Sequence, residues 1–416
     1  MFLPLANTRR KTFRGIASRL AMALALAGGA AVGSAAIAPA AYAQENSRGF
    51  VAAYEPIGAL IQGEMPNWAQ ASAQFETLVA AIENEDDRNV AGNLALQIGT
   101  NTSNPAFQRR GLEMMLASGK VAPEQLGQFN YYVGTLSYQA GDFDAARTAL
   151  EAAIAAGYTE EDPRGIILQS YFDQDRVPDG ITYLESQIAA SGTVDENWIL
   201  RALQESYDAE LVPQANQVSA LLLKQYPSQK NWVNALQVMN AINQLDAQAQ
   251  LDLFRLMRTT NALTQRAEYV RYIENADPRI MANEVLPVLA EGLAADHFTT
   301  TDDYYTEVKS IADVRAPQDR AEVDSLFSEG QAGDGREALI AGDVLYSVND
   351  YARAEVLYKA AVDKGADRDA ALTRLGMVQA LQGKGAEAVA TLEQVSGARA
   401  PVAQMWAIYA QEQTGA

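Results

Sequence analysis

The sequence predicts an all-α fold, a superhelical solenoid of about nine or ten antiparallel helical hairpins. Small residues recur about every 34 residues, as when Gly342 and Ala354 return as Gly376 and Ala388. A fixed period of this length indicates a repeated unit of two helices. Apolar residues within the units follow helical spacing, and no segment alternates apolar and polar residues as a half-buried strand does.

The first 43 residues have the features of a removable export signal. Five basic and no acidic residues are followed by the apolar segment 20–40 and then by Ala41-Tyr42-Ala43, which has the small residues of a cleavage site. An uncleaved membrane anchor is the alternative, since about 20 apolar residues span a bilayer. Gly28 and Pro39 disfavour a spanning helix. We expect cleavage near Ala43, by either the general or the twin-arginine export route.

The composition restricts the compartment and the partners. The 416 residues include no cysteine and one histidine, and the formal net charge is −20. Loss of the five basic residues of the signal would leave a net charge of −25. Such a chain repels nucleic acid and anionic lipid, so we expect no nucleic-acid binding, no stable membrane insertion after cleavage, and a basic partner. These features together predict an exported protein of the bacterial periplasm.

Residues 44–258 are predicted to form a first solenoid. Helical spacing begins near Pro56, and the acidic segment Glu83–Arg88 is expected to be a charged loop. Asn104 is expected to cap the helix that begins at Pro105. Further hairpins are predicted in the ranges 127–157, 161–190 and 195–227, and another begins at Trp232.

The period is blurred in residues 259–330, which we expect to be degenerate helical repeats or a bend. Asp302 is expected to cap a helix there, and Pro317 to begin another. The period returns in residues 331–416, with a pair of hairpins and a capping helix that begins at Pro401. The polar outer face of that last helix is typical of a terminal repeat.

The hairpin at residues 131–153 shows the unit most clearly. It resembles a tetratricopeptide repeat, with a small residue inside each helix and an aromatic residue after the turn. The resemblance implies a stack of helix pairs in which these positions set the packing of the two helices. The structural repeat positions are Gly134, Phe143, Ala146, Gly342, Tyr351, Ala354, Gly376 and Ala388.

In this family the first helices of the repeats line a concave face that binds peptides. Transfer of the register assigns partner contacts to Tyr131, Tyr138, Gln139, Phe172, Tyr207, Arg336 and Tyr346, and places Gln169, Asp173 and Asp343 on the same face. Aromatic rings with flanking amides suit an extended or helical peptide. The alternative is that the rings pack between repeats. The Lys, Arg and Asn set with which the family binds a free carboxylate is not found.

Catalytic chemistry has little support in the sequence. Asp296 and His297 would form a base and its orienting group, but adjacent residues on a helix do not face each other. The acidic runs Glu160–Asp162 and Asp302-Asp303 lack the spacing of a helix–loop–helix calcium site. We therefore expect no enzyme activity, no metal and no cofactor.

The function predicted from these features is a non-catalytic periplasmic scaffold that binds another envelope protein or peptide. Two alternatives stay open. One is an accessory factor in polysaccharide export or cell-wall synthesis, which exposed aromatics next to acidic residues at Asp302-Asp303-Tyr304-Tyr305 would favour. The other is a hydrolase with its site in residues 258–330, where His297 would be the obvious group.

Overall fold

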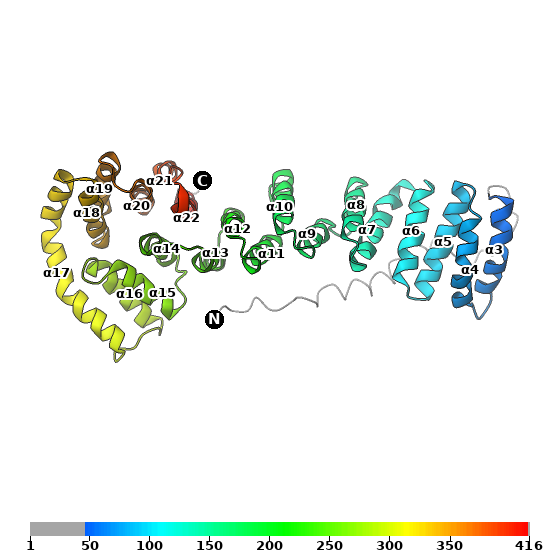
Figure 1. The fold of residues 1–416 in the computed structure, drawn as a ribbon, viewed down its shortest axis with the longest axis horizontal. Coiled ribbons are helices and arrows are strands. Elements are labelled where there is room, and N and C mark those ends of the chain that lie inside the picture. The colour runs from blue at the N-terminus through cyan, green and yellow to red at the C-terminus, as the bar shows by residue number, and fades with distance from the viewer. Residues whose placement is uncertain (1–45, 415–416) are drawn as a thin grey trace. The chain divides into compact units, whose positions relative to one another are not determined.

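The computed structural model describes residues 46–414, so the predicted signal and its cleavage site lie outside the described residues. That part of the chain contains twenty α-helices, one short 3₁₀ helix and no strand, which confirms the all-α prediction. Within residues 48–172 and within residues 177–414, helices adjacent in sequence pack against each other (Figure 1). None of these helices is both long and apolar enough to cross a membrane.

The chain divides into two compact units, with the boundary between Arg176 and Val177. Both predicted boundaries, at 258 and at 330, fall inside the second unit. The helices of unit 1 are α3 (Arg48–Ile61), α4 (Trp68–Ala80), α5 (Glu85–Asn101), α6 (Pro105–Ala117), α7 (Pro123–Gln139), α8 (Phe143–Ala155) and α9 (Arg164–Phe172).

Unit 2 begins at Val177. Its helices are α10 (Val177–Ser191), α11 (Glu196–Asp208), α12 (Val212–Gln225), α13 (Gln229–Ile242), α14 (Ala247–Thr259), α15 (Arg266–Ala276), α16 (Ala282–Ala294), α17 (Asp303–Ala332), α18 (Gly335–Ser347), α19 (Tyr351–Asp363), α20 (Arg368–Leu381), α21 (Gly385–Leu392), η1 (Gly397–Arg399) and α22 (Ala400–Thr414).

Capping side chains decide where several helices of unit 1 begin. Asn104 accepts hydrogen bonds from the backbone N–H groups of Ala106 and Phe107, which confirms its predicted role. The predicted charged loop at Glu83–Arg88 is wrong. Asn84 caps α5 there, and three acidic residues occupy the first helical turn, where the helix dipole favours negative charge. Buried Asp87 also accepts hydrogen bonds from the backbone and hydroxyl of Ser47.

The region predicted as degenerate repeats or a bend contains the hairpin α15–α16 and the long helix α17. Asp302 caps α17 as predicted, but the expected helix start at Pro317 is wrong, because α17 continues through it for a total of 30 residues. Proline removes one intrahelical hydrogen bond. The helix continues because Ala312 and Ala316 are buried against the core and Asn283 of α16 donates a hydrogen bond to the Ala316 carbonyl.

Unit 2 turns back on itself. α22 contacts α12 and α14, and α20 contacts α14, so the last repeats pack against helices far earlier in the chain (Figure 1). One continuous apolar core follows this path and includes residues from Ala220 to Ala410. The C-terminal helices therefore close unit 2.

Small residues lie where paired helices approach each other most closely. A methyl group at Gly134 would lie 2.5 Å from Cγ of Leu150, and one at Gly376 would lie 2.3 Å from Cγ of Leu392. A methyl group at Gly342 would lie 2.6 Å from Cε1 in the ring of Tyr358. Ala146, Ala354 and Ala388 are fully buried, whereas Phe143 and Tyr351, which begin second helices, are half-buried.

We expect Gly134→Ala to lower the free energy of unfolding by about 1–3 kcal/mol, because the added methyl group overpacks the contact between α7 and α8. Gly49→Ala in α3 is the matched control, since a methyl group there meets only Oε1 of Glu83 at 3.2 Å. Urea unfolding followed by far-ultraviolet circular dichroism compares the two variants. Equal effects would contradict the proposed role of the close contact at Gly134.

Candidate functional site

The predicted partner face in unit 1 brings together side chains from α7 and α9. The hydroxyl of Tyr138 donates to the carboxylate of Asp173, and Nε2 of Gln169 donates to the same carboxylate at 2.8 Å. Tyr138 is half-buried, while Gln139 and Asp173 are exposed. These side chains form an open, anionic face, which we call the α7–α9 face.

Two other predicted contact residues of unit 1 lie inside the fold. The ring of Tyr131 stacks on Tyr158 with 4.6 Å between centroids, and its hydroxyl is 3.4 Å from Oε2 of Glu161. Burial and the Glu161 charge raise the pKa of Tyr131 to about 12. Phe172 is 4% exposed. Both rings therefore contribute packing surface to unit 1.

In unit 2 the predicted positions have different surroundings. Tyr207 on α11 is half-buried and Arg336 on α18 is exposed. Tyr346, also on α18, is buried, and the guanidinium of Arg255 lies 4.2 Å from its ring centroid. Asp343, one turn before Tyr346, is buried as well. This side of α18 faces α14 and α20, so the chain itself occupies it.

A buried network of charged residues holds the closure of unit 2. Its centre is Asp252 of α14, which is fully buried. Its carboxylate accepts hydrogen bonds from Arg399 at 2.6 Å, from Arg255 at 3.2 Å and from Arg374 at 3.4 Å. Its backbone carbonyl accepts a hydrogen bond from the indole of Trp406 at 3.0 Å. One residue of α14 thus binds both α20 and α22.

Two further carboxylates complete this network. Arg255 makes a bidentate contact with Glu284, with both distances 2.8 Å, and the hydroxyl of Tyr272 donates to Glu284 at 2.7 Å. Arg374 donates to Asp343 at 2.6 Å. Burial by itself would lower the pKa of Arg374, but Asp343 and Asp252 raise it above its ordinary value, so the guanidinium remains charged.

The sequence contains only a weak signal for this network. Asp252 and Arg255 interrupt the apolar run Leu251–Leu256, and charged residues within such a run indicate a paired, buried site. Their partners Arg374 and Arg399 follow 122 and 147 residues later. No spacing rule connects residues so far apart.

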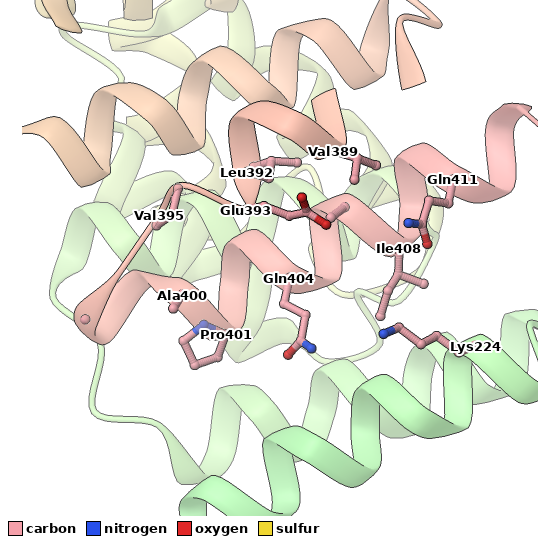
Figure 2. Close-up of a pocket in the computed structure, with 12 residues that line it drawn as sticks. Lys224, Val389, Leu392, Glu393, Val395, Ala400, Pro401, Gln404, Ile408 and Gln411 are labelled. Atoms are coloured by element: carbon pink, nitrogen blue, oxygen red, sulfur yellow. The ribbon is translucent and has the colours of Figure 1, made fainter. Parts of the chain in front are cut away.

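The closure also leaves a cavity of about 450 Å³ among α12, α21 and α22. Figure 2 shows Gln404 and Ile408 on α22, Glu393 after α21, and Lys224 on α12 around it. The floor is apolar, since Leu392 and Ile408 are 2% and 3% exposed. We call this cavity the α12–α22 pocket.

The residues that would support the alternative functions have structural contacts. Tyr304 stacks on Phe298 with 5.9 Å between centroids, and its hydroxyl donates to the Val270 carbonyl at 3.3 Å. Tyr305 is only 8% exposed. The His297 ring lies 5.1 Å from that of Tyr269, so its neighbour is an aromatic ring rather than an orienting carboxylate.

We expect Asp252→Asn to lower the free energy of unfolding by about 3–5 kcal/mol, because buried arginines from two distant helices lose their shared anion. Urea unfolding followed by tryptophan fluorescence measures this, since Trp232 and Trp406 lie at the closure. Asp324→Asn is the control, because Asp324 is 94% exposed in its pair with Arg353 and its loss should leave the midpoint unchanged. A midpoint for Asp252→Asn equal to the control would refute the role of the network.

Glu355 gives unit 2 a pH-dependent contribution to stability. Burial would raise its pKa, but hydrogen bonds from Lys359, Lys384 and Gln382 outweigh that effect and lower the pKa to about 2 from an ordinary value of 4.5. The stabilisation is therefore complete above about pH 4.5 and is lost as the pH falls towards 2. We expect the stability difference between the wild type and Glu355→Gln to shrink over this interval.

Urea unfolding at a series of pH values measures that difference. Glu387→Gln, which changes an exposed carboxylate on α21, is the control and should show no such trend. A difference for Glu355→Gln that stays constant from pH 5 to pH 2 would contradict the lowered pKa.

Part of the chain is similar to a known protein family, and its fold resembles solved structures. The tetratricopeptide repeat profile matches residues 345–412. No curated protein sequence matches the chain. The solved structures that are similar to this chain include two helical-repeat proteins. One is the Naa15/Naa10 complex bound to HypK-THB, with 11% identity, 86% of this chain and 65% of that chain covered, and a TM-score of 0.31. The other is the pentatricopeptide repeat protein PPR10 from maize. Its identity is 13%, the match covers 84% of this chain and 50% of that chain, and the TM-score is 0.30.

This chain thus spans less than two thirds of the length of either structure. With identities of 11% and 13% and TM-scores of 0.31 and 0.30, these similarities carry no functional information. The profile match is more specific. It covers the end of α18 and all of α19 to α21, and it extends into α22. The predicted resemblance is confirmed there, since residues 345–412 match the tetratricopeptide repeat model.

Proposed function

We propose that this protein is an exported, non-catalytic scaffold that binds another protein of the bacterial cell envelope in the periplasm. Stacked helical repeats form extended surfaces suited to protein partners. The basic start, apolar segment and small-residue site of residues 1–43 support export, and the absence of cysteine is compatible with an oxidising compartment.

One observation carries the choice of binding surface. The groove positions of α18, Asp343 and Tyr346, are buried against the chain's own Arg374 and Arg255. The residue after each groove ring of unit 1, Gln139 after Tyr138 and Asp173 after Phe172, is exposed. The corresponding residue of α18, Ser347, is 2% exposed. Because the chain itself covers the groove side of α18, the α7–α9 face is the groove surface that we propose for the partner.

The chemistry of the α7–α9 face indicates the kind of partner. Asp173 offers a carboxylate that the Tyr138 hydroxyl and the Gln169 amide orient. An arginine or lysine of the partner would pair with that carboxylate, and Gln139 would bind the partner's backbone. The net charge of −25 that remains after loss of the signal would speed the approach of a basic segment.

The double change Gln139→Lys and Asp173→Lys tests the proposal without removing a buried ring. The tagged chain is cross-linked in the periplasm of its host, and captured proteins are identified by mass spectrometry. We expect one envelope protein to be captured by the wild type and lost by the variant, because its basic segment meets two lysines. The recovered chain should begin at Gln44.

Thr148→Lys with Glu151→Lys is the matched control, since it adds the same charge to exposed positions of α8. The control should retain the partner, and circular dichroism should show equal helix content in all three proteins. Capture that survives the change on the α7–α9 face would refute that face as the binding surface. A chain found in the cytoplasm with residues 1–43 intact would refute the periplasmic location.

A further inference from the structure

A second surface, separate from the α7–α9 face, also has the composition of a binding site. The α12–α22 pocket exists only because unit 2 closes, since α22 packs against both α21 and α12. Its floor consists of the aliphatic side chains of Leu392, Val395 and Ile408, each 8% exposed or less. Its volume of about 450 Å³ falls within the range of sites that hold small molecules or side chains.

The rim of the pocket carries unused hydrogen-bonding and charged groups. Lys224, Glu393, Gln404 and Gln411 are exposed, and within residues 46–414 none of their side chains has an ion-pair or hydrogen-bond partner. Nearby charged residues behave differently. Lys384 is paired with Glu355, and Arg399 with Asp252. The rim therefore offers four polar side chains to a ligand above an apolar floor.

The spacing on α22 matches an extended peptide. Gln404, Ile408 and Gln411 share one face of the helix, as Figure 2 shows. The two glutamines are two turns apart, about 10.5 Å along the axis, which is the length of about three residues of an extended chain. Each side-chain amide has a donor and an acceptor, as a peptide group does. An extended segment can bond to both amides and direct the side chain between them onto Ile408.

The two charged side chains make the two walls of the pocket different, so a bound peptide would have a preferred orientation. Lys224 approaches the pocket from α12, and Glu393 approaches from the end of α21 (Figure 2). Opposite charges on opposite walls favour an acidic side chain on one side of the ligand and disfavour it on the other. We infer that the α12–α22 pocket binds an extended segment of a partner protein that places an aliphatic side chain on Ile408 and a carboxylate against Lys224.

Two pools of blocked, fluorescein-labelled pentapeptides test this inference. Both have leucine fixed at the centre and differ at one fixed neighbouring position, glutamate in one pool and lysine in the other. Fluorescence anisotropy with the purified chain measures their binding. We expect the glutamate pool to bind about threefold more tightly, the contribution of one exposed charge pair. Lys224→Glu should reverse this preference, and Gln404→Ala should weaken both pools.

Lys230→Glu is the matched control, because Lys230 is another exposed lysine without a partner in residues 46–414 but lies outside the pocket lining. It should leave the preference unchanged. Equal binding of the two pools, no binding of either, or a preference that Lys230→Glu also removes would each overturn the inference. The α7–α9 face is intact in all of these variants, so failure here leaves the proposed scaffold function standing.

Discussion

Three arginines converge on one buried carboxylate, and the closure of unit 2 depends on that convergence. Asp252 binds Arg255 of its own helix, Arg374 of α20 and Arg399 just before α22. Charges removed from water are stable only when their partners are in place. The network therefore favours a single position for the last repeats on α14, which apolar packing alone would specify less sharply.

That closure determines which surfaces remain for a partner. In a linear stack of repeats, the helix face that carries Asp343 and Tyr346 would form part of an open groove. Here the same face packs against arginines of the chain, so this part of the repeat pattern contributes to the fold of unit 2. The closure also brings α12 beside α22 and thereby creates a pocket that no single repeat contains.

Most of the local architecture could be predicted. Asn104 and Asp302 cap helices because their side chains accept hydrogen bonds from the first backbone N–H groups, a contact made within three residues. Gly134 and Gly376 mark close helix contacts for equally local reasons, since each faces the second helix of its own hairpin. Two errors arose where packing or capping outweighed composition, and a third at α3, which begins at Arg48 and contains Pro56. Pro317 lies inside a helix that its neighbours hold, and the acidic Glu85–Asp87 segment begins a helix.

The candidate sites were less predictable. The register placed Tyr138, Gln169 and Asp173 on the first-helix face, and hydrogen bonds to Asp173 bring these side chains together. It gave no means to distinguish Tyr138, which is half-buried, from Tyr346, which is buried. That difference depends on what packs against each helix from outside its own repeat.

The sequence by itself determined the helical repeats, their caps, their close contacts and the acidic character of the chain, because each follows from composition or from residues within one hairpin. Only the tertiary structure decided that Asp252 meets Arg374 and Arg399, which lie 122 and 147 residues further along the chain. The path of the later repeats is the sum of many small rotations between neighbouring helices. No local pattern encodes that sum, so the closed unit, its buried network and its pocket appear only in the folded chain.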